Sequence, residues 1–298
     1  MTVPLVSVIV GVYNKKAHVG ECLDSVFGQT YRNFELIVVD DCSTDGSPDV
    51  IRGFRDSRIN FIQRNVNSSL PAVPRNQAMK MAHGKYLAFL DADDVWMPDK
   101  LEEQISYMET RPAFPFTHTR CMVVDGGGRD LYLRSHGNYP PDGDCFVELL
   151  KKCFICTSTV MLRKELADVV GYFSEEQELR CGEDHEYFLR CARRVHIGMP
   201  EGVLAKYRWC PDSTFHHPDN WRATTAGLLL NHPYLWKDRI TPSEIRDILY
   251  GIMGENVYYW RTRLDFRKAS WFAGQMIRFR PCSLEGWRQL AASGLRRK

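Results

Sequence analysis

Hydrophobic positions in residues 6–110 follow two alternating patterns. Short apolar runs rich in Val and Ile predict buried β-strands, and the segments between them space their apolar residues three or four apart, which predicts helices. The expected strands are Val6–Val12, Phe34–Val39, Ile59–Gln63 and Tyr86–Leu90. The expected helices are Val19–Phe27, a short helix that begins near Pro48, Pro74–Ala82 and Pro98–Thr110. Four strand–helix repeats with short connections predict an α/β fold, in which helices cover both faces of a parallel sheet.

The pattern is less regular between residues 111 and 210. Further strands are expected at Phe116–Val124, Ser158–Leu162 and Val203–Trp209, and helices at Phe146–Lys152 and from about Glu183. Glycines and prolines between residues 126 and 143 predict long loops, which at a sheet edge often form substrate lids. We expect residues 1–210 to form one domain.

Residues 211–298 are predicted to form a mainly helical extension. Their apolar stripe at helical spacing comprises Ile245, Ile248, Leu249, Ile252, Met253, Val257, Trp260 and Leu264. Residues 255–298 contain ten Lys and Arg but only three Asp and Glu. Five of the seven tryptophans follow residue 220: Trp221, Trp236, Trp260, Trp271 and Trp287. A basic, aromatic tail can bind an anionic membrane surface peripherally. We favour the alternative, a helical cap with a solvated basic face.

The overall composition is that of a soluble globular protein. Hydrophobic residues make up 44% and charged residues 26% of the 298 positions, and the net charge of +2 argues against a nucleic-acid partner. No signal peptide and no apolar stretch of about 18 residues is found. Ten cysteines without an export signal are expected to be reduced, which indicates a cytoplasmic protein, or one that lies peripherally at the inner face of the membrane. Cys153 and Cys156 have the spacing of a redox or metal pair, but no second pair follows, so we expect ordinary thiols.

Polar side chains follow three of the predicted strands at the point where each strand ends. They are Tyr13 after the first strand, Asp40 and Asp41 after the second, and Asp91, Asp93 and Asp94 after the fourth. The carboxyl ends of parallel strands share one edge of the sheet, where open α/β sheets bind ligands. Crowded carboxylates repel one another unless a cation or a proton offsets them. The sequence therefore predicts a divalent-metal site for a phosphorylated ligand, with a capped strand-to-helix turn as the alternative.

In their order and spacing, these residues resemble the family 2 glycosyltransferases, which are inverting enzymes of the GT-A fold. The resemblance extends from Val6 to about Trp209, and its landmarks are Ser7–Asn14, Val38–Asp45, Pro74–Asn76, Asp91–Asp94 and the Glu183-Asp184 pair. It implies a Rossmann-like, mixed but mostly parallel catalytic domain over residues 1–210. It also implies transfer of a sugar from a nucleotide-sugar to the hydroxyl of a saccharide or lipid-linked acceptor. We favour a UDP-sugar as the donor, although dTDP-sugars share the pyrimidine edge and GDP-sugars occur in the family. Such enzymes commonly build bacterial surface polysaccharides or glycoconjugates.

The resemblance assigns nucleotide binding to one set of residues, namely Val12, Tyr13, Asp41, Arg75, Asp91 and Ala92. The ring of Tyr13 can stack on a pyrimidine base, and Asp41 can accept the ring N–H of uracil. The guanidinium of Arg75 is suited to phosphate.

The resemblance also implies Mg²⁺ or Mn²⁺, with Asp93 as the protein ligand. A hard cation with oxygen ligands removes the repulsion between the carboxylates and the diphosphate, and it stabilises the departing nucleoside diphosphate. Asp91 would not bind the metal directly. It would contact the groups around the metal or the ribose. The role of Asp94 stays open, because it could simply cap the turn.

Inversion by a single displacement needs one general base opposite the leaving group. In the family this base is the Asp of an acidic pair, which here is Asp184, supported by Glu183. Either acid could instead cap its helix. The adjacent His185 could titrate near neutrality, but we expect it to be a surface residue.

One family pattern is incomplete. The Q-x-x-R-W motif of processive synthases appears only as Arg208-Trp209, because Ala205 stands in place of the glutamine. No membrane span is predicted either, so we expect a non-processive enzyme, in which residues 206–209 form a strand near the acceptor.

Other functions fit fewer of these residues. The segment from Asp91 to Val95 also matches the nucleophile motif of metal-dependent phosphatases, but that motif follows a first strand and leaves Tyr13, Asp41 and Asp184 unexplained. The sequence lacks the glycine-rich, basic loop that a nucleotidyltransferase carries after its first strand. It also lacks the G-x-G-x-x-G motif of a nicotinamide-binding site. A non-catalytic module that binds nucleotide-sugars remains an alternative.

Overall fold

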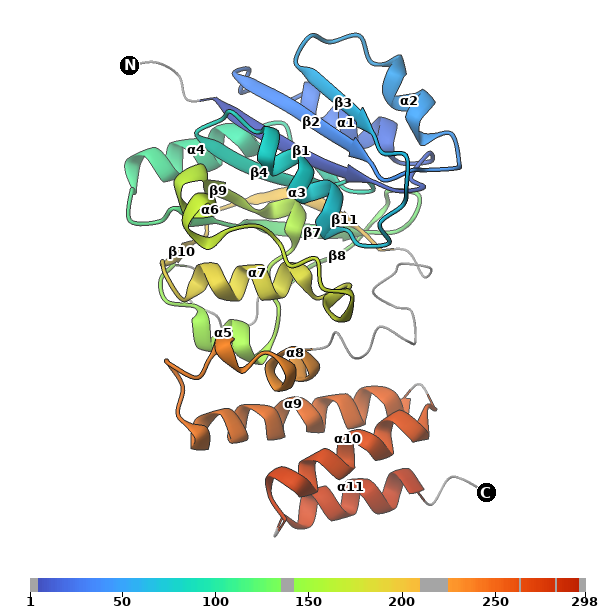
Figure 1. Ribbon diagram of the computed structural model, residues 1–298, viewed down its shortest axis with the longest axis vertical. Helices are drawn as coiled ribbons and strands as arrows, with labels where there is room; N and C mark the ends of the chain where they lie inside the picture. Colours follow the sequence, from blue (N-terminus) through green and yellow to red (C-terminus); the bar gives the residue numbers. More distant parts are fainter. Residues whose placement is uncertain (1–4, 135–141, 210–224, 263, 282, 295–298) are drawn as a thin grey trace. The chain divides into compact units, whose positions relative to one another are not determined.

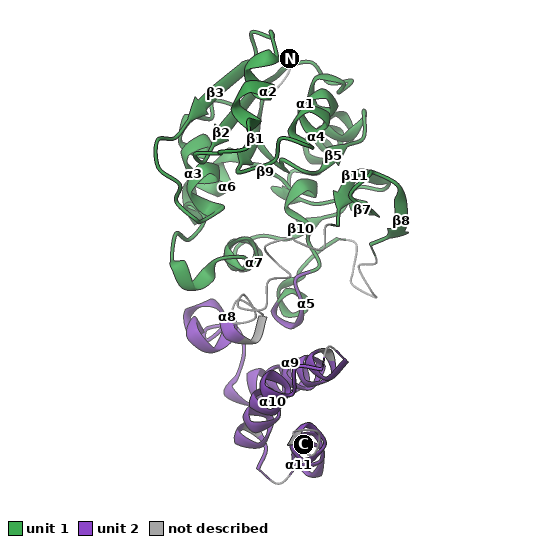
Figure 2. Cartoon of the chain, turned by 90° about the vertical axis from the view of Figure 1, so that its right-hand side faces the viewer, with its two compact units in different colours: residues 1–149, 154–220 green, residues 150–153, 221–298 purple. Residues whose placement is uncertain are grey.

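The computed structural model describes residues 5–134, 142–209, 225–262, 264–281 and 283–294. The chain divides into two compact units (Figure 2). The first unit comprises residues 1–149 and 154–220, and the second comprises residues 150–153 and 221–298. Trp221 and residues 135–141 of the expected loop region lie outside the described residues.

The first unit is built on the four predicted strand–helix repeats (Figure 1). The strands are β1 (Val6–Val12), β2 (Phe34–Asp40), β3 (Ile59–Gln63) and β4 (Tyr86–Asp91). The helices are α1 (Val19–Phe27), α2 (Ser47–Gly53), α3 (Ala72–Met81) and α4 (Lys100–Thr110). β1 pairs in parallel with both β2 and β4, and β2 pairs in parallel with β3. The predicted parallel α/β core is therefore confirmed.

Both faces of this sheet are buried, which explains the continuous apolar runs of its strands. Alternate residues of β1, such as Val8 and Val10, pack with Leu23 of α1 and Leu101 of α4. On the opposite face the rings of Phe89 of β4 and Phe173 pack edge to face, with their centroids 5.4 Å apart. The strands are consequently packed on both faces.

Three short strands extend this sheet beyond β4. They are β9 (Met161–Arg163), β6 (Phe116–Thr117) and β10 (Ile197–Gly198), which give the order β10-β6-β9-β4-β1-β2-β3. β9 runs antiparallel to β4, so the sheet is mixed but mostly parallel. The predicted strand Ser158–Leu162 is partly wrong, because Thr157–Thr159 forms a 3-10 turn and the strand begins only at Met161.

A second, smaller sheet has the order β5-β11-β7-β8. Its strands are β5 (Val95–Trp96), β11 (Val203–Arg208), β7 (Arg120–Val124) and β8 (Asp130–Leu133). The prediction of one strand over Phe116–Val124 is wrong, because β6 belongs to the first sheet and β7 to the second. The chain changes sheets at His118 and Thr119, whose buried polar groups interrupt the apolar run. β8 lies in the region expected to be loop.

Three further helices complete the first unit, and α5 and α7 follow their predictions closely. They are α5 (Phe146–Lys151), which ends in the second unit, α6 (Lys164–Val170) and α7 (Glu183–Ala192). A short 3-10 turn at Gln177–Leu179 precedes α7. The acidic pair therefore opens a helix, as predicted.

The second unit is helical, as predicted for the extension. Its helices are α8 (Thr225–Asn231), α9 (Pro242–Thr262), α10 (Phe266–Phe279) and α11 (Leu284–Gly294), with a 3-10 turn at Pro233–Leu235. The predicted stripe of α9 is mostly buried, but Leu264 lies beyond the helix end and is 69% exposed. Among the helices of the described chain, none has the length and apolarity needed to cross a bilayer.

Candidate active site

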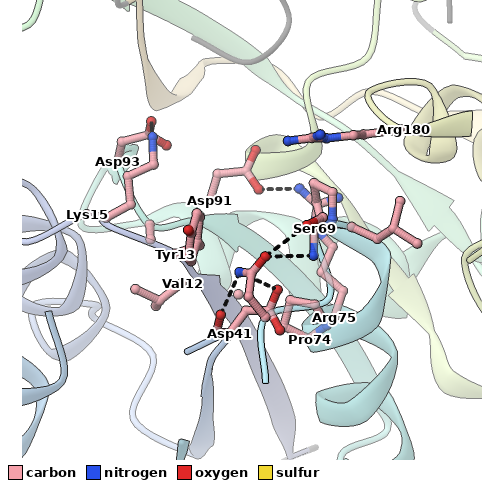
Figure 3. A pocket seen from close by; sticks show the side chains of 15 residues that line it. Val12, Tyr13, Lys15, Asp41, Ser69, Pro74, Arg75, Asp91, Asp93 and Arg180 are labelled. Atoms are coloured by element: carbon pink, nitrogen blue, oxygen red, sulfur yellow. Dashed lines mark hydrogen bonds and ion pairs between the residues drawn. The ribbon is translucent and has the colours of Figure 1, made fainter. Parts of the chain in front are cut away.

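The register of the parallel strands brings the predicted polar residues together. Val12 is opposite Asp40 across β1 and β2, and Gly11 is opposite Asp91 across β1 and β4. A cavity of about 320 Å³ opens at this edge of the sheet (Figure 3). Its lining includes the residues expected to hold the nucleotide and the metal, namely Val12, Tyr13, Asp41, Arg75, Asp91, Ala92 and Asp93. The rest of the lining consists of Gly11, Lys15, Asn67, Ser69, Leu70, Pro71, Pro74 and Arg180.

Asp41 fixes one end of the cavity by holding the loop that precedes α3. Its carboxylate accepts hydrogen bonds from the backbone N–H and the hydroxyl of Ser68, at 3.0 and 2.6 Å, and from the side-chain amide of Asn67 at 3.2 Å. Arg64 Nε lies 2.8 Å from the other carboxylate oxygen. Asp41 is only 3% exposed, whereas Tyr13 beside it is 48% exposed and offers its ring to a ligand.

The other end of the cavity is highly charged. The ammonium group of Lys15 forms an ion pair with Asp93, and Arg75 Nη2 lies 2.6 Å from Asp91 Oδ1 (Figure 3). Ala92 between the two acids is buried, so its side chain cannot contribute chemistry. The first and third residues of the Asp-x-Asp motif are therefore both neutralised by cations from other segments.

Arg75 links this motif to the acidic pair of α7. Its Nη1 donates to Glu183 Oε1 at 2.8 Å while its Nη2 holds Asp91. Burial opposes the charge of Arg75, but the two carboxylates outweigh it and hold the pKa of the guanidinium above its ordinary value. In this arrangement Arg75 binds two acids, so the expectation of a phosphate ligand stays a prediction.

The two acids of α7 have different surroundings. Glu183 is 5% exposed, and burial raises the pKa of its carboxyl, although the charge of Arg75 opposes that shift. Asp184 is more accessible; it accepts hydrogen bonds from Thr157 Oγ1 at 3.1 Å and from the backbone N–H of His185 at 2.7 Å. Asp184 is thus the freer carboxylate of the pair, although it does not line the cavity itself.

His185 is not the surface residue that we expected. Its ring is 4% exposed, and Nε2 lies 2.6 Å from the carbonyl oxygen of Leu149. Burial lowers the pKa of the imidazole. The amphipathic pattern of α7 places this residue on the inner side of the helix, where it supports the fold.

Asp94 has a structural role that its sequence position left open. Its carboxylate accepts a hydrogen bond from Ser158 Oγ at 2.5 Å and from the backbone N–H of Arg208 at 2.7 Å. The residue is 1% exposed, and burial raises the pKa of its carboxyl well above the ordinary value. Asp94 therefore joins the Asp-x-Asp loop to the turn before β9 and to β11.

Arg208 supports the same loop from the second sheet. It is 4% exposed, its Nε donates to the carbonyl oxygen of Asp93 at 2.8 Å, and its Nη2 donates to Glu21 at 2.6 Å. Its Nη1 donates to the carbonyl oxygen of Gly126 at 3.0 Å. Arg208 of the incomplete Q-x-x-R-W motif thus positions the backbone of Asp93.

Backbone strain is concentrated around the cavity. Of the five non-glycine residues with positive φ in the described chain, four are lining residues or their immediate neighbours: Asn14, Cys42, Ser69 and Cys181. Such conformations cost free energy and persist where the surrounding structure enforces them, often at functional sites.

The charged end suits a divalent ion that shares its ligands with a substrate. The described residues contain no group of three or more His, Cys, Asp or Glu side chains that could hold a metal on its own. Mg²⁺ and similar ions are often held by one or two carboxylates together with substrate phosphates. Asp93, which lines the cavity with Asp91 nearby, provides such an incomplete ligand set.

Sequence reasoning missed two cations of the site, Lys15 and Arg180. Lys15 follows Tyr13 by two residues and Arg180 precedes Glu183 by three, so each stands next to a landmark. Basic residues in loops are usually solvated, and only the fold shows that both line the cavity.

The amino-acid sequence matches the family model described as "Glycosyl transferase family 2" over residues 7–171. It is 35% identical over 225 residues to a putative teichuronic acid biosynthesis glycosyltransferase, TuaG, of Bacillus subtilis, covering 74% of this chain and 84% of TuaG. It is 39% identical over 158 residues to an Escherichia coli β-1,3-glucosyltransferase, WfaP, named for UDP-Glc and α-D-GlcNAc-diphosphoundecaprenol, covering 53% of this chain and 60% of WfaP. The chain spans 60% of the length of WfaP and 33% to 44% of the length of three other curated relatives.

Solved structures share the fold at lower sequence identity. S. aureus TarS (residues 1–349), crystallised with UDP-GlcNAc, superposes with a TM-score of 0.68 at 20% identity, over 97% of this chain and 79% of that chain. The mannosyltransferase PcManGT of Pyrobaculum calidifontis, crystallised with GDP-Man and Mn²⁺, gives a TM-score of 0.60 at 20% identity, over 99% and 81% of the two chains. The fold that these structures share is the GT-A fold. The family model and the curated relatives show that this chain is a glycosyltransferase and belongs to glycosyl transferase family 2.

Proposed function

We propose that this enzyme transfers a sugar from a UDP-sugar to an acceptor hydroxyl with inversion at the anomeric carbon. The observation that carries the proposal is the cavity itself. A buried acid, Asp41, lies at one end and the charged Asp91–Asp93 motif lies at the other, with the ring of Tyr13 between them. A nucleoside diphosphate has the matching order of flat base and anionic diphosphate.

Uracil is the base that we propose for the first end. Asp41 holds its loop with hydrogen bonds from Ser68 and Asn67, and each carboxylate oxygen has more than one lone pair. It can therefore still accept the ring N–H of uracil, while Tyr13 covers the face of the base. The S. aureus TarS structures with UDP and UDP-GlcNAc support a uridine nucleotide, and the PcManGT complex shows that a relative of this fold takes GDP-Man instead.

Asp184 is the proposed general base. Glu183 is buried and occupied by Arg75, so Asp184 is the carboxylate of the pair that can approach an acceptor hydroxyl. It would take the hydroxyl proton as that oxygen attacks the anomeric carbon. Thr157, which donates to one oxygen of Asp184, fixes the orientation of the carboxylate, and Glu183 supports it by anchoring the start of α7.

We propose Asp93 as the protein ligand of Mn²⁺ or Mg²⁺. A bound divalent ion would offset the charge of the diphosphate and of the leaving group. Lys15 has to release Asp93 when this happens. Asp91 stays held by Arg75, which leaves Asp93 as the exchangeable carboxylate.

We propose a saccharide or lipid-linked acceptor in surface polysaccharide synthesis. The names of TuaG and WfaP, a teichuronic acid enzyme and an enzyme acting on a diphosphoundecaprenol-linked sugar, support this class of acceptor. An acceptor of this kind would be presented at the inner face of the membrane.

The second unit offers a surface that fits such a location, and we propose peripheral contact with anionic lipid. Arg267, Trp271 and Arg278 share one outward face of α10, and Trp287 and Arg288 lie on the outward face of α11. Trp271 and Trp287 are 43% and 53% exposed. No ion pair joins these three arginines to any carboxylate among the described residues. Exposed aromatic and basic side chains on one helix face are typical of interfacial helices.

Release of nucleoside diphosphate tests the enzymatic proposal. Purified protein should liberate UDP from at least one member of a panel of UDP-sugars, in the presence of Mn²⁺ and a candidate acceptor, and EDTA should stop the release. A phosphatase would instead release inorganic phosphate from phosphate esters, and that result would contradict the proposal.

A further inference from the structure

Arg180 is a cavity residue for which neither the sequence motifs nor the site described above provides a role. It lies between the 3-10 turn at Gln177–Leu179 and the start of α7, and its guanidinium extends over the cavity on the side of Asp91 (Figure 3). Its Nε is fully buried and has no hydrogen-bond partner among the residues that the structure describes. The next residue, Cys181, has a φ of 66°, so the backbone of this loop is strained beside the cavity.

The other two cations of the charged end are already neutralised. Lys15 is paired with Asp93, and Arg75 is shared between Asp91 and Glu183. No carboxylate in the described part of the chain forms an ion pair with Arg180. A buried donor of a charged group that lacks a partner costs free energy, so it needs an explanation, and a ligand in the adjacent cavity is one.

The position of Arg180 indicates which ligand group it meets. In Figure 3 Asp41 lies at the lower side of the cavity and Arg180 at the upper side, with Asp91 and Asp93, while Tyr13 lies between Asp41 and Asp93. In a nucleoside diphosphate oriented by its base, the diphosphate reaches this end. A guanidinium offers several N–H donors in one plane, which match phosphate oxygens.

We propose that Arg180 binds the diphosphate of the donor and neutralises the nucleoside diphosphate as it leaves. This inference rests on the proposed function. In the transfer step the bond from the anomeric carbon to the β-phosphate oxygen breaks, and its electron pair stays on that oxygen. The acceptor oxygen forms the new bond to the anomeric carbon, and its proton passes to Asp184. Arg180 donates hydrogen bonds to the phosphate oxygens on which negative charge increases.

Calorimetric titration of the full-length protein with uridine, UMP and UDP, in EDTA and in Mn²⁺, tests the proposal. Arg180→Gln should weaken UDP binding about 10- to 100-fold, the usual effect of losing a hydrogen bond to a charged group. It should leave uridine binding within about two-fold, because the base end is unchanged. The loss should be present without the metal. Arg180→Lys keeps the charge but not the planar fork, and it should retain part of the UDP affinity.

Arg194→Gln is the matched control, because this exposed arginine lies just beyond α7 and does not line the cavity. Equal UDP affinity of wild type and Arg180→Gln would overturn the proposal. So would a loss that appears equally with uridine, which indicates a structural role. If the wild type binds neither UDP nor any UDP-sugar, the proposed function itself fails, and the two failures are thereby distinguished.

Discussion

Glu183 and Asp184 are neighbours in the chain, but their surroundings assign them different tasks. Arg75 binds Glu183 and, through its other nitrogen, Asp91 of the Asp-x-Asp motif. One buried arginine therefore connects the nucleotide side of the site to the helix that carries the proposed base. Asp184 keeps its more exposed position because Glu183, not Asp184, satisfies this cation.

Asp184→Asn should separate binding from chemistry. The amide can keep the hydrogen bond from Thr157 but cannot accept the acceptor's proton, so the transfer rate should fall about 10²- to 10⁴-fold while UDP affinity is retained. Steady-state kinetics with calorimetric UDP binding measures both. Glu178→Gln, an exposed acid of the preceding turn, is the control and should behave as the wild type. Unchanged turnover in Asp184→Asn would reject Asp184 as the base.

Asp93→Asn should remove the metal-dependent part of UDP binding. An amide oxygen is a weaker ligand for a hard cation than a carboxylate, and no second carboxylate of the motif is unpaired, because Arg75 holds Asp91. Titrations of UDP with and without Mn²⁺ should then give the same affinity in the variant. Asp99→Asn, an exposed residue just before α4, is the control. A Mn²⁺ effect of wild-type size in Asp93→Asn would place the metal elsewhere.

At the residue level, the sequence predicted which acids would meet but not what would neutralise them. Asp41, Asp91 and Asp93 follow strands whose order could be inferred, and the register confirms that these strand ends are adjacent. Their cationic partners come from other segments: Lys15 is 78 residues from Asp93, and Arg75, which was expected to meet phosphate, pairs with Asp91. Only the folded chain reveals such pairs.

At the level of elements, the connection between α3 and β4 is unusually tight. The backbone N–H of Gly84 donates to Ser7 Oγ at 2.8 Å. A Cβ at this position would lie 2.6 Å from the backbone nitrogen of Ser7 and 2.8 Å from the carbonyl oxygen of Leu5. Glycine is thus required here by the close approach of β1, which is the central strand of the site.

Gly84→Ala should destabilise the first unit by about 1–3 kcal/mol, the usual cost of overpacking, because both contacts are backbone atoms that cannot move aside. Urea unfolding measures the change. Gly53→Ala is the matched control, since a Cβ at the end of α2 meets nothing within 4 Å, and its effect should be neutral or stabilising. Equal unfolding midpoints for the two variants would contradict this account of the α3–β4 connection.

Periodicity located the long elements well and the short ones poorly. β1 to β4 and α1 to α4 match their predicted ranges within about two residues, because a doubly covered sheet demands long apolar runs. The stretches 116–124 and 158–162 were each predicted as a single strand, but buried polar residues interrupt both. His118 and Thr119 separate β6 from β7, and Thr157–Thr159 forms a 3-10 turn before β9. The partners of these polar residues, such as Asp94 for Ser158, lie far away in the sequence.

At the level of the whole molecule, the second unit can be tested separately for lipid binding. The protein should sediment with vesicles of phosphatidylglycerol and phosphatidylcholine but not with pure phosphatidylcholine, and added salt should weaken the binding. Replacing Arg267, Arg278 and Arg288 by Glu should abolish sedimentation, because each cation contributes roughly 1 kcal/mol at an anionic surface.

The control for charge is the replacement of Arg55, Arg120 and Arg194 by Glu, since these exposed arginines belong to the first unit. It should leave vesicle binding intact. Equal behaviour of the two triple variants would reject the second unit as the lipid-binding surface. Binding to both vesicle types alike would reject anionic lipid as the partner.

Hydrolysis of a UDP-α-sugar, followed by proton NMR in the first minutes, tests the central claim most directly. A panel of UDP-glucose, UDP-galactose and UDP-N-acetylglucosamine with Mn²⁺ needs no knowledge of the acceptor, since water can take its place. The account predicts UDP together with the β-anomer of the released sugar before mutarotation, and loss of both in Asp184→Asn. Release of the α-anomer, or no metal-dependent turnover of any member of the panel, would contradict it.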